Sequence, residues 1–287
     1  MSDTLRAALW MSGAIVSFST MAVAGRTVSL ELDTFEIMMY RSFVGVFIVV
    51  TISAIAGTFS QINKRSLGLH FFRNISHFAG QNLWFYAITA IPLAQVFALE
   101  FTTPLWVLVL SPIVLGERLT HTRGVAAILG FVGILIVARP GATAINAGLI
   151  TAGLSAIGFA FALMLTKRLT RTESTTCILF YLTVMQAVFG VLFAGWDFDI
   201  AVPSLSSAPW VVLIGLAGLL AHFCITNALS IAPATVVIPI DFIRLPAIAV
   251  IGMLLYNEPL DIFVFLGALL IFGGNYYNIL AETRPRR

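Results

Sequence analysis

Acidic side chains stand inside long apolar segments of this sequence, where each would meet lipid instead of water. Glu100 lies in the segment 93–115 and Asp241 in the segment 234–256, and each segment is long enough to cross a bilayer. A carboxylate at that depth costs about 2.5 kcal/mol or more on insertion scales, so it is typical of a functional site. We therefore predict that Glu100 and Asp241 are site residues.

A second polar set follows one face of the apolar segment 68–89. Arg73, His77, Gln81 and Trp84 recur at four, four and three residues, which places them on one side of a helix. Such a face can bind a ligand, with the arginine on a carboxylate or phosphate and the indole stacked on a planar group. The alternative is that Arg73 extends to the membrane surface and His77 bonds a neighbouring backbone. Both interpretations remain open at this point.

Each intramembrane acid needs a cation. Asp241 and Arg244 lie three residues apart and can meet on one helical face, either as a neutralised pair or as part of the site. Glu100 has no cation in its own segment, so its partner must be Arg41, Arg73 or Arg244. If that partner leaves during a functional cycle, Glu100 will take up a proton. Glu100 and Asp241 are therefore the predicted coupling residues.

Two further polar pairs occur in apolar segments. Arg41 lies near Glu36 and either attracts an anion or pairs with Glu36, of which we expect the second. His222 and Thr226 share a helical face and are expected to project into a cavity, although an isolated histidine more often serves packing.

The composition describes a polytopic membrane protein. Of 287 residues, 59% are hydrophobic and 10% are charged, against about 25% charged in an average soluble domain. Cys177 and Cys224 fall inside apolar segments, which favours buried thiols over a disulfide or metal pair. Ten segments are long and apolar enough to be transmembrane helices: 6–25, 35–56, 68–89, 93–115, 122–138, 147–167, 175–195, 208–230, 234–256 and 261–281.

The loop charges set the orientation. With the N-terminus in the cytoplasm, Arg26 and Arg139 fall in outer loops, and eleven cations fall in inner loops or at the termini. By the positive-inside rule, both termini are cytoplasmic. The eleven are Arg6, Lys64, Arg65, Arg118, Arg123, Lys167, Arg168, Arg171, Arg284, Arg286 and Arg287.

The sequence contains an internal duplication. Residues 90–120 align with residues 231–261 at an offset of 141, which superposes Pro92 on Pro233, Glu100-Phe101 on Asp241-Phe242, and Glu117 on Glu258. The two final glutamates lie at segment ends and are predicted to cap or pair with a neighbouring helix. Five segments per half is an odd number, so the halves 1–141 and 142–287 must enter the membrane from opposite sides. The predicted fold is an all-α membrane protein of ten transmembrane helices, built as two inverted five-helix repeats.

These features resemble a known family. The ten-segment plan, the duplicated halves and the run PLWVLVLSPIVLGERLTHTRGVAAILGFVGI, residues 104–134, are similar to the drug/metabolite transporter superfamily, in particular its EamA-type branch. The second half departs with Asn257-Glu258-Pro259-Leu260, and residues 16–19 lack the usual Trp-Gly-Ser. The resemblance implies secondary transport of amino acids, riboflavin, S-adenosylmethionine or nucleotide-type cofactors across the bacterial inner membrane.

The main rival is an intramembrane enzyme or metal-binding protein that uses His77, His222, Glu100 and Asp241. The sequence contains no GxxxxGK[ST], HExxH or G-x-S-x-G motif, which disfavours an ATPase, a zinc protease and a serine hydrolase. We predict a transporter of a small polar or planar metabolite that works by alternating access, with proton coupling as one option. No catalytic residue, metal, cofactor or nucleic-acid partner is expected, and the protein is a monomer or a homodimer.

Overall fold

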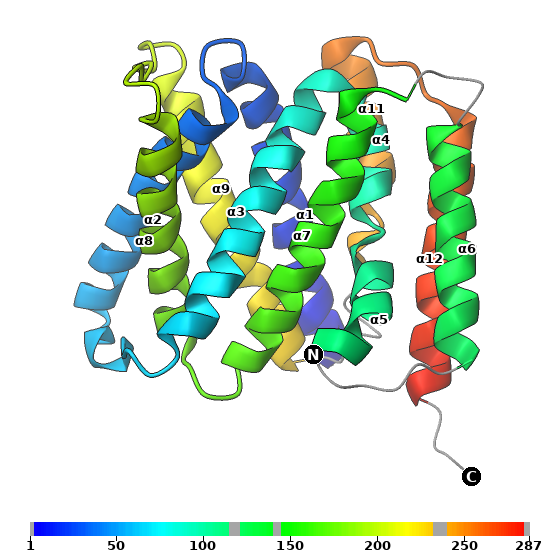
Figure 1. Ribbon diagram of the computed structural model, residues 1–287, viewed down its shortest axis with the longest axis horizontal. Coiled ribbons are helices and arrows are strands. Elements are labelled where there is room, and N and C mark those ends of the chain that lie inside the picture. The colour runs from blue at the N-terminus through cyan, green and yellow to red at the C-terminus, as the bar shows by residue number, and fades with distance from the viewer. Residues whose placement is uncertain (1–2, 115–120, 140–144, 232–239, 284–287) are drawn as a thin grey trace.

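The computed structural model describes residues 3–114, 121–139, 145–231 and 240–283, and every regular element in these ranges is helical (Figure 1). The element numbers follow Figure 1. The helices are α1 (Asp3–Val28), α2 (Thr34–Ile55), the 3₁₀ turn η1 (Phe59–Gln61), α3 (Leu67–Ala90), α4 (Leu93–Glu100), α5 (Thr103–Val114), α6 (His121–Ala138), α7 (Ala147–Leu169), α8 (Thr175–Ala194), α9 (Ala208–Ile231), α11 (Arg244–Tyr256) and α12 (Ile262–Thr283).

The chain is a multi-pass membrane protein. Six helical stretches are long and apolar enough to span a bilayer, and three shorter apolar helices accompany them. The polar helix α3 is 24 residues long and is thus also long enough to cross. If α4 and α5 count as one crossing and residues 240–256 as part of another, the ten predicted crossings are present. Eight of the predicted segments agree with a helix to within three residues at each end.

The two halves run in opposite directions. In Figure 1, α1 rises from the lower face, whereas α7 descends from the upper face, and α12 ends at the face where α1 begins. The helix contacts follow a two-fold pattern: α1 packs on α9 as α3 packs on α7. The pairs α2–α8 and α6–α12 each join a helix to its counterpart in the other half, and α4 packs on α11, the counterpart of α5. The predicted inverted repeat is therefore confirmed.

Local sequence explains where several helices begin. Asp33 accepts from the Glu36 N–H and Glu36 from the Asp33 N–H, which is a complete capping box for α2. Asn146 caps α7 and Ser174 caps α8, each through a side-chain oxygen that accepts a backbone N–H three residues later.

The predicted helix over 93–115 is wrong in one respect, because it is broken directly after Glu100. Residues 101 and 102 form a turn, and α5 begins at Thr103 with Pro104 in its first turn, where a missing N–H does no harm. The break frees the Phe101 carbonyl, which accepts from Asn275 Nδ2 at 3.4 Å.

The second half breaks at the equivalent place. Asp241 is followed by a turn at residues 242–243, and α11 begins at Arg244. The two turns meet, because the rings of Phe101 and Phe242 lie 4.6 Å apart. The duplication therefore places Glu100 and Asp241 each at the end of a helix, facing the same region of the interior.

Glycine allows one close contact between the halves. At Gly133 of α6, an added Cβ would lie 2.6 Å from the Gly267 carbonyl oxygen of α12, and at Gly267 it would lie 2.6 Å from the Gly133 carbonyl oxygen. Any side chain at either position would push α6 and α12 apart.

Candidate functional site

The first part of the site is a charge network around Arg244. Arg244 Nη2 donates to Glu100 Oε1 at 3.0 Å and to Asp241 Oδ2 at 2.9 Å. Trp84 Nε1 of α3 donates to the other Glu100 oxygen at 2.8 Å. The predicted pairing of Asp241 with Arg244 is thereby confirmed, and Arg244 is the partner that Glu100 lacked in its own helix. We call these four residues the acid network; it holds two carboxylates and one guanidinium.

Aromatic rings enclose the arginine of the acid network. The Arg244 guanidinium lies 4.8 Å from the Phe18 ring centroid, 4.9 Å from Phe97 and 5.1 Å from Phe101, and Arg244 is only 3% exposed. These rings exclude water and stabilise the cation through their faces. Asp241 Oδ1 and Arg244 Nε are buried and have no hydrogen-bond partner among the described residues. The network therefore has unused donor and acceptor capacity.

The second part of the site begins with Arg73 on α3. Its Nε donates to Thr166 Oγ1 of α7 at 3.1 Å, and its Nη1 donates to Asn74 Oδ1 at 2.8 Å. Arg73 is 4% exposed. It therefore points into the bundle. The alternative prediction, in which Arg73 extends to the membrane surface, is wrong.

Amide and imidazole groups continue from Arg73 into the bundle. Gln186 Nε2 of α8 lies 3.3 Å from the Asn74 carbonyl oxygen and 2.9 Å from His77 Nδ1. The His77 ring centroid lies 5.5 Å from that of His222 on α9. The two histidines are therefore neighbours, and His77 bonds a side chain and not a backbone group.

Arg41 of α2 completes this second part. It is 8% exposed, and its Nη1 donates a weak hydrogen bond to Met38 Sδ at 3.6 Å. A cavity of about 20 Å³ beside it is also lined by Gln186 and His222. We call Arg41, Arg73, Asn74, His77, Gln186 and His222 the basic cluster. Neither arginine of the cluster forms an ion pair with any acid in the described part of the chain.

The expected pairing of Arg41 with Glu36 is wrong. The Glu36 carboxylate accepts from the Asp33 backbone N–H at 2.8 Å and from the Ala201 N–H at 2.5 Å. Because the capping box and the α8–α9 loop occupy both oxygens, Glu36 serves the start of α2 and leaves Arg41 without an acid.

A single ring separates the acid network from the basic cluster. The Phe18 centroid of α1 lies 5.9 Å from the His222 ring, edge to face, and 4.8 Å from the Arg244 guanidinium carbon. The two regions are therefore adjacent, and a ligand that displaced the Phe18 ring would contact both.

Seven of the eight predicted site residues thus lie in one of these two regions. Gln81 is the exception: it is 3% exposed and its Nε2 has no hydrogen-bond partner among the described residues. Sequence reasoning missed Phe18, Asn74 and Gln186. For the two amides a signal was present, since each stands inside an apolar segment. For Phe18 there was none, because one phenylalanine in an apolar helix resembles any other. Thr226, predicted beside His222, has its side chain outside the described part.

The set that the rival metal interpretation requires is not assembled. His77 and His222 lie in the basic cluster, whereas Glu100 and Asp241 share Arg244 in the acid network. Both cysteines are free and buried, as predicted.

A separate lock closes one end of the interior. Arg26 of α1 forms an ion pair with Glu258 and donates to the Ile88 and Ile91 carbonyls at the end of α3. Glu258 also accepts from the Leu93 N–H at 2.9 Å, at the start of α4. We call this group the outer lock, because the orientation predicted from the loop charges puts this end of the bundle outside. Glu258 therefore pairs with a neighbouring helix as predicted, while Glu117 lies outside the described residues.

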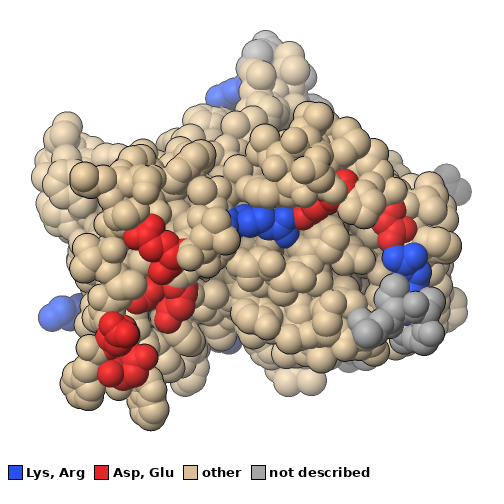
Figure 2. Space-filling model, turned by 90° about the horizontal axis from the view of Figure 1, so that it is seen from above, with Lys and Arg blue, Asp and Glu red and all other residues tan. Residues whose placement is uncertain are grey.

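Figure 2 shows the face that carries this lock. Basic groups on it stand against acids, and further acids gather toward one edge. The pairs are Arg26–Glu258 and Arg139–Asp261.

Comparisons with known proteins agree with this architecture. The chain is 26% identical to an S-adenosylmethionine uptake transporter of Rickettsia bellii, over 96% of this chain and 94% of that protein. It is 31% identical to a riboflavin transporter of Brucella anthropi, over 77% and 79%, and 27% identical to one of Vibrio cholerae, over 99% and 96%. A solved crystal structure matches with a TM-score of 0.66 and 17% identity, over 97% of this chain and 98% of that one, which supports the fold alone. The model of the EamA-like transporter family matches twice, at residues 5–139 and 146–280. The chain belongs to the EamA-like transporter family.

Proposed function

We propose that this protein is a secondary transporter whose small-metabolite substrate binds between the acid network and the basic cluster. The observation that carries the proposal is the pair Arg41 and Arg73, both buried in the bundle and neither paired with a described acid. A buried cation without a counter-charge destabilises the fold, so its presence indicates a functional role. A transported anion supplies the missing charge.

The charge arrangement favours a substrate with both signs of charge. With neutral histidines, the basic cluster carries two positive charges, from Arg41 and Arg73. The acid network carries one net negative charge, because Glu100 and Asp241 share Arg244. A carboxylate or phosphate at the arginines and an ammonium or other cation at the acids satisfies both regions.

The aromatic rings at the boundary of the two regions can stack on a planar group of the substrate. Phe18 stands there with its ring against His222, and Trp84 borders the acid network. The relatives are named as transporters of S-adenosylmethionine and of riboflavin. S-adenosylmethionine combines an amino-acid group, a further cation and a planar base, whereas riboflavin is planar and has no amino-acid group. We therefore place amino-acid-bearing metabolites with a planar ring first, and flavins second.

Alternating access follows from the inverted repeat and the two helix breaks. The breaks after Glu100 and Asp241 are hinges at the site itself, where bending needs no further loss of helical hydrogen bonds. The outer lock joins α1 to the α3–α4 connection and to the end of α11, so its release opens that end. In this proposal the halves 1–141 and 142–287 move against each other.

Glu100 is the proposed coupling residue, with Asp241 in support. When Arg244 moves away from Glu100, the carboxylate stays in an apolar surround and takes up a proton. Return of Arg244 releases that proton. The side of the membrane to which Glu100 is accessible when it binds or releases the proton then sets the direction of proton flow.

The proposed location is the bacterial inner membrane, with both termini cytoplasmic and one chain sufficient for transport. In support, the described loops at the lower face of Figure 1 carry a group of cations, and the opposite face carries mostly acids. The group consists of Lys64, Arg65, Lys167, Arg168 and Arg171. This matches the positive-inside rule.

Uptake into proteoliposomes tests the proposal. Purified protein would be given labelled S-adenosylmethionine, amino acids and riboflavin, each with and without a pH gradient. We expect saturable uptake of a compound that bears an anionic group, stimulated by the gradient. The Arg73→Gln variant in matched liposomes is the control for leakage. Folded protein that moves no compound of the panel would count against the substrate class proposed.

A further inference from the structure

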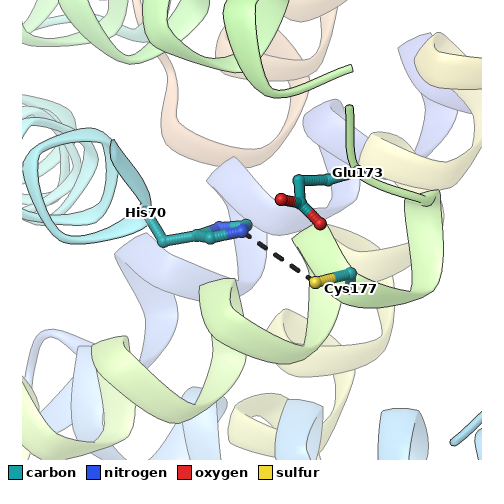
Figure 3. Close-up of side chains that lie close together, drawn as sticks. All are labelled: His70, Glu173 and Cys177. Atoms are coloured by element: carbon teal, nitrogen blue, oxygen red, sulfur yellow. Dashed lines mark hydrogen bonds between the residues drawn. The ribbon is translucent and has the colours of Figure 1, made fainter. Parts of the chain in front are cut away.

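A histidine, a glutamate and a cysteine that the proposed transport mechanism does not use meet at the start of α3 and α8 (Figure 3). Their potential ligand atoms all lie within 4.8 Å of one another, and Cys177 Sγ is 4.0 Å from His70 Nε2. All three residues are buried: His70 is 1% exposed, Cys177 0% and Glu173 7%. They come from two segments: His70 lies in α3, whereas Glu173 in the loop before α8 and Cys177 in the first turn of α8 are four residues apart.

The imidazole and the thiol have few hydrogen-bond partners outside this set of three residues. His70 Nδ1 has no hydrogen-bond partner among the described residues, and its Nε2 faces only the sulfur. The thiol has weak contacts to that nitrogen and to the Asn63 carbonyl oxygen at 3.8 Å, and it also donates to the Glu173 carboxylate. A buried imidazole and thiol in this state lack the partners that buried polar groups normally have.

Glu173 is held in place but not neutralised. Its oxygens accept from Ser66 Oγ and Asn63 Nδ2, each at 2.7 Å, and it forms no ion pair with a described cation. Neutral donors behind a carboxylate are the usual outer shell of a metal ligand.

We propose that His70, Glu173 and Cys177 form a Zn²⁺ site. Imidazole nitrogen, thiolate sulfur and carboxylate oxygen are the ligands that zinc takes, at about 2.0–2.3 Å. Atoms around a tetrahedral zinc are then about 3.2–3.7 Å apart, so small side-chain movements close the observed set. Water fills the fourth position. The Tyr181 ring, 4.5 Å from that of His70, holds the imidazole toward the sulfur.

The site joins the two halves of the protein at the lower face of Figure 1. His70 belongs to α3 of the first half, while Glu173 and Cys177 belong to the second half. The outer lock joins the halves at the opposite face. Zinc would therefore act as a crosslink at the other end of the molecule, at a place where the sequence predicts no metal.

Cobalt spectroscopy tests the site directly. Chelator-treated protein in detergent would be titrated with Co²⁺ and then with Zn²⁺. We expect a thiolate-to-cobalt charge-transfer band that appears with one equivalent and is removed by zinc, together with a zinc-dependent rise in Tm. Absence of the band in the folded wild-type protein would overturn the proposal.

Variants assign the ligands. Cys177→Ser should lose the band, and Cys224→Ser, which changes the other buried free cysteine, should keep it. If Cys177→Ser does not fold, Glu173→Gln replaces it. This variant keeps the thiol, and we expect it to weaken cobalt affinity about 100-fold or more and to remove the zinc effect on Tm. A band that survives in folded Cys177→Ser, or unchanged affinity in Glu173→Gln, would show that these residues are not ligands.

Discussion

The acid network and the basic cluster are adjacent, yet they treat their charges in opposite ways. Arg244 is paired twice, with Glu100 and with Asp241, and is enclosed by aromatic rings. Arg41 and Arg73 are also buried, yet their hydrogen bonds within the described part of the chain go to neutral groups. A fold that needed its arginines only for packing would pair all three. The contrast supports our proposal that Arg41 and Arg73 bind a charge from outside the chain, whereas Arg244 neutralises the two acids.

The largest effect is expected at Arg244. Arg244→Gln leaves two partly buried carboxylates without a cation, and breaking a well-buried pair in this way costs up to about 3–5 kcal/mol of unfolding free energy. Reversible unfolding in detergent would measure the change. The triple variant Glu100→Gln, Asp241→Asn, Arg244→Gln removes every charge and should recover most of the loss. A single variant within about 0.5 kcal/mol of wild type would show that Arg244 is not structural.

The second-largest effect is expected at the outer lock. Arg26→Gln removes the ion pair to Glu258 and a donor to two carbonyls at the end of α3, a loss of about 1–3 kcal/mol. The same change should open that end, so an introduced Leu93→Cys, buried in the parent, should become reactive to an impermeant thiol reagent.

The control for the lock is a second ion pair on the same face. Arg139→Gln breaks the pair with Asp261 between α6 and α12, away from the α3–α4 connection. It should leave the reactivity of Leu93→Cys unchanged. Equal labelling in both variants would mean that the Arg26 contact is not a gate.

A smaller effect is expected at Glu100. Glu100→Gln keeps an oxygen for the Trp84 N–H but cannot exchange a proton, so the protein should fold and lose gradient-driven uptake by about tenfold, equal to about 1.4 kcal/mol. Uptake with and without a pH gradient in proteoliposomes would measure this. Full gradient dependence in the variant would remove Glu100 from the coupling role.

The smallest effect is expected at Arg6. Its ion pair with Asp3 joins side chains that are 53% and 72% exposed, and exposed pairs contribute about 0–1 kcal/mol. Arg6→Gln should therefore change neither Tm nor substrate affinity. It serves as the control for removing one positive charge from the protein.

The sequence predicted the parts of this molecule that depend on repetition and on lipid. The apolar segments predicted the helices. The constant offset that aligns Glu100 with Asp241 predicted the duplication, and five segments per half predicted that the halves are inverted. The cation for Glu100 was narrowed to three residues, of which Arg244 is the one observed. These inferences succeed because a bilayer penalises each charge independently of the tertiary fold.

Contacts between distant segments were beyond the sequence. Glu36 pairs with the backbone of Ala201 and not with Arg41, because a loop 165 residues away happens to reach it. The break after Glu100 places Phe101 against Phe242, with ring centroids 4.6 Å apart, although the two residues are distant in the sequence. His70 and Cys177 are 107 residues apart, and no spacing motif connects them.

The central claim is that the basic cluster serves the substrate and not the fold, and Arg73→Gln tests it most directly. The measurement is Tm and the Kd for S-adenosylmethionine, amino acids and riboflavin, made on the same preparation. We predict that Tm stays equal or rises, because an unpaired buried cation is removed, and that binding of an anionic compound weakens at least about tenfold. A lower Tm with unchanged Kd values would contradict the account and make Arg73 a structural residue.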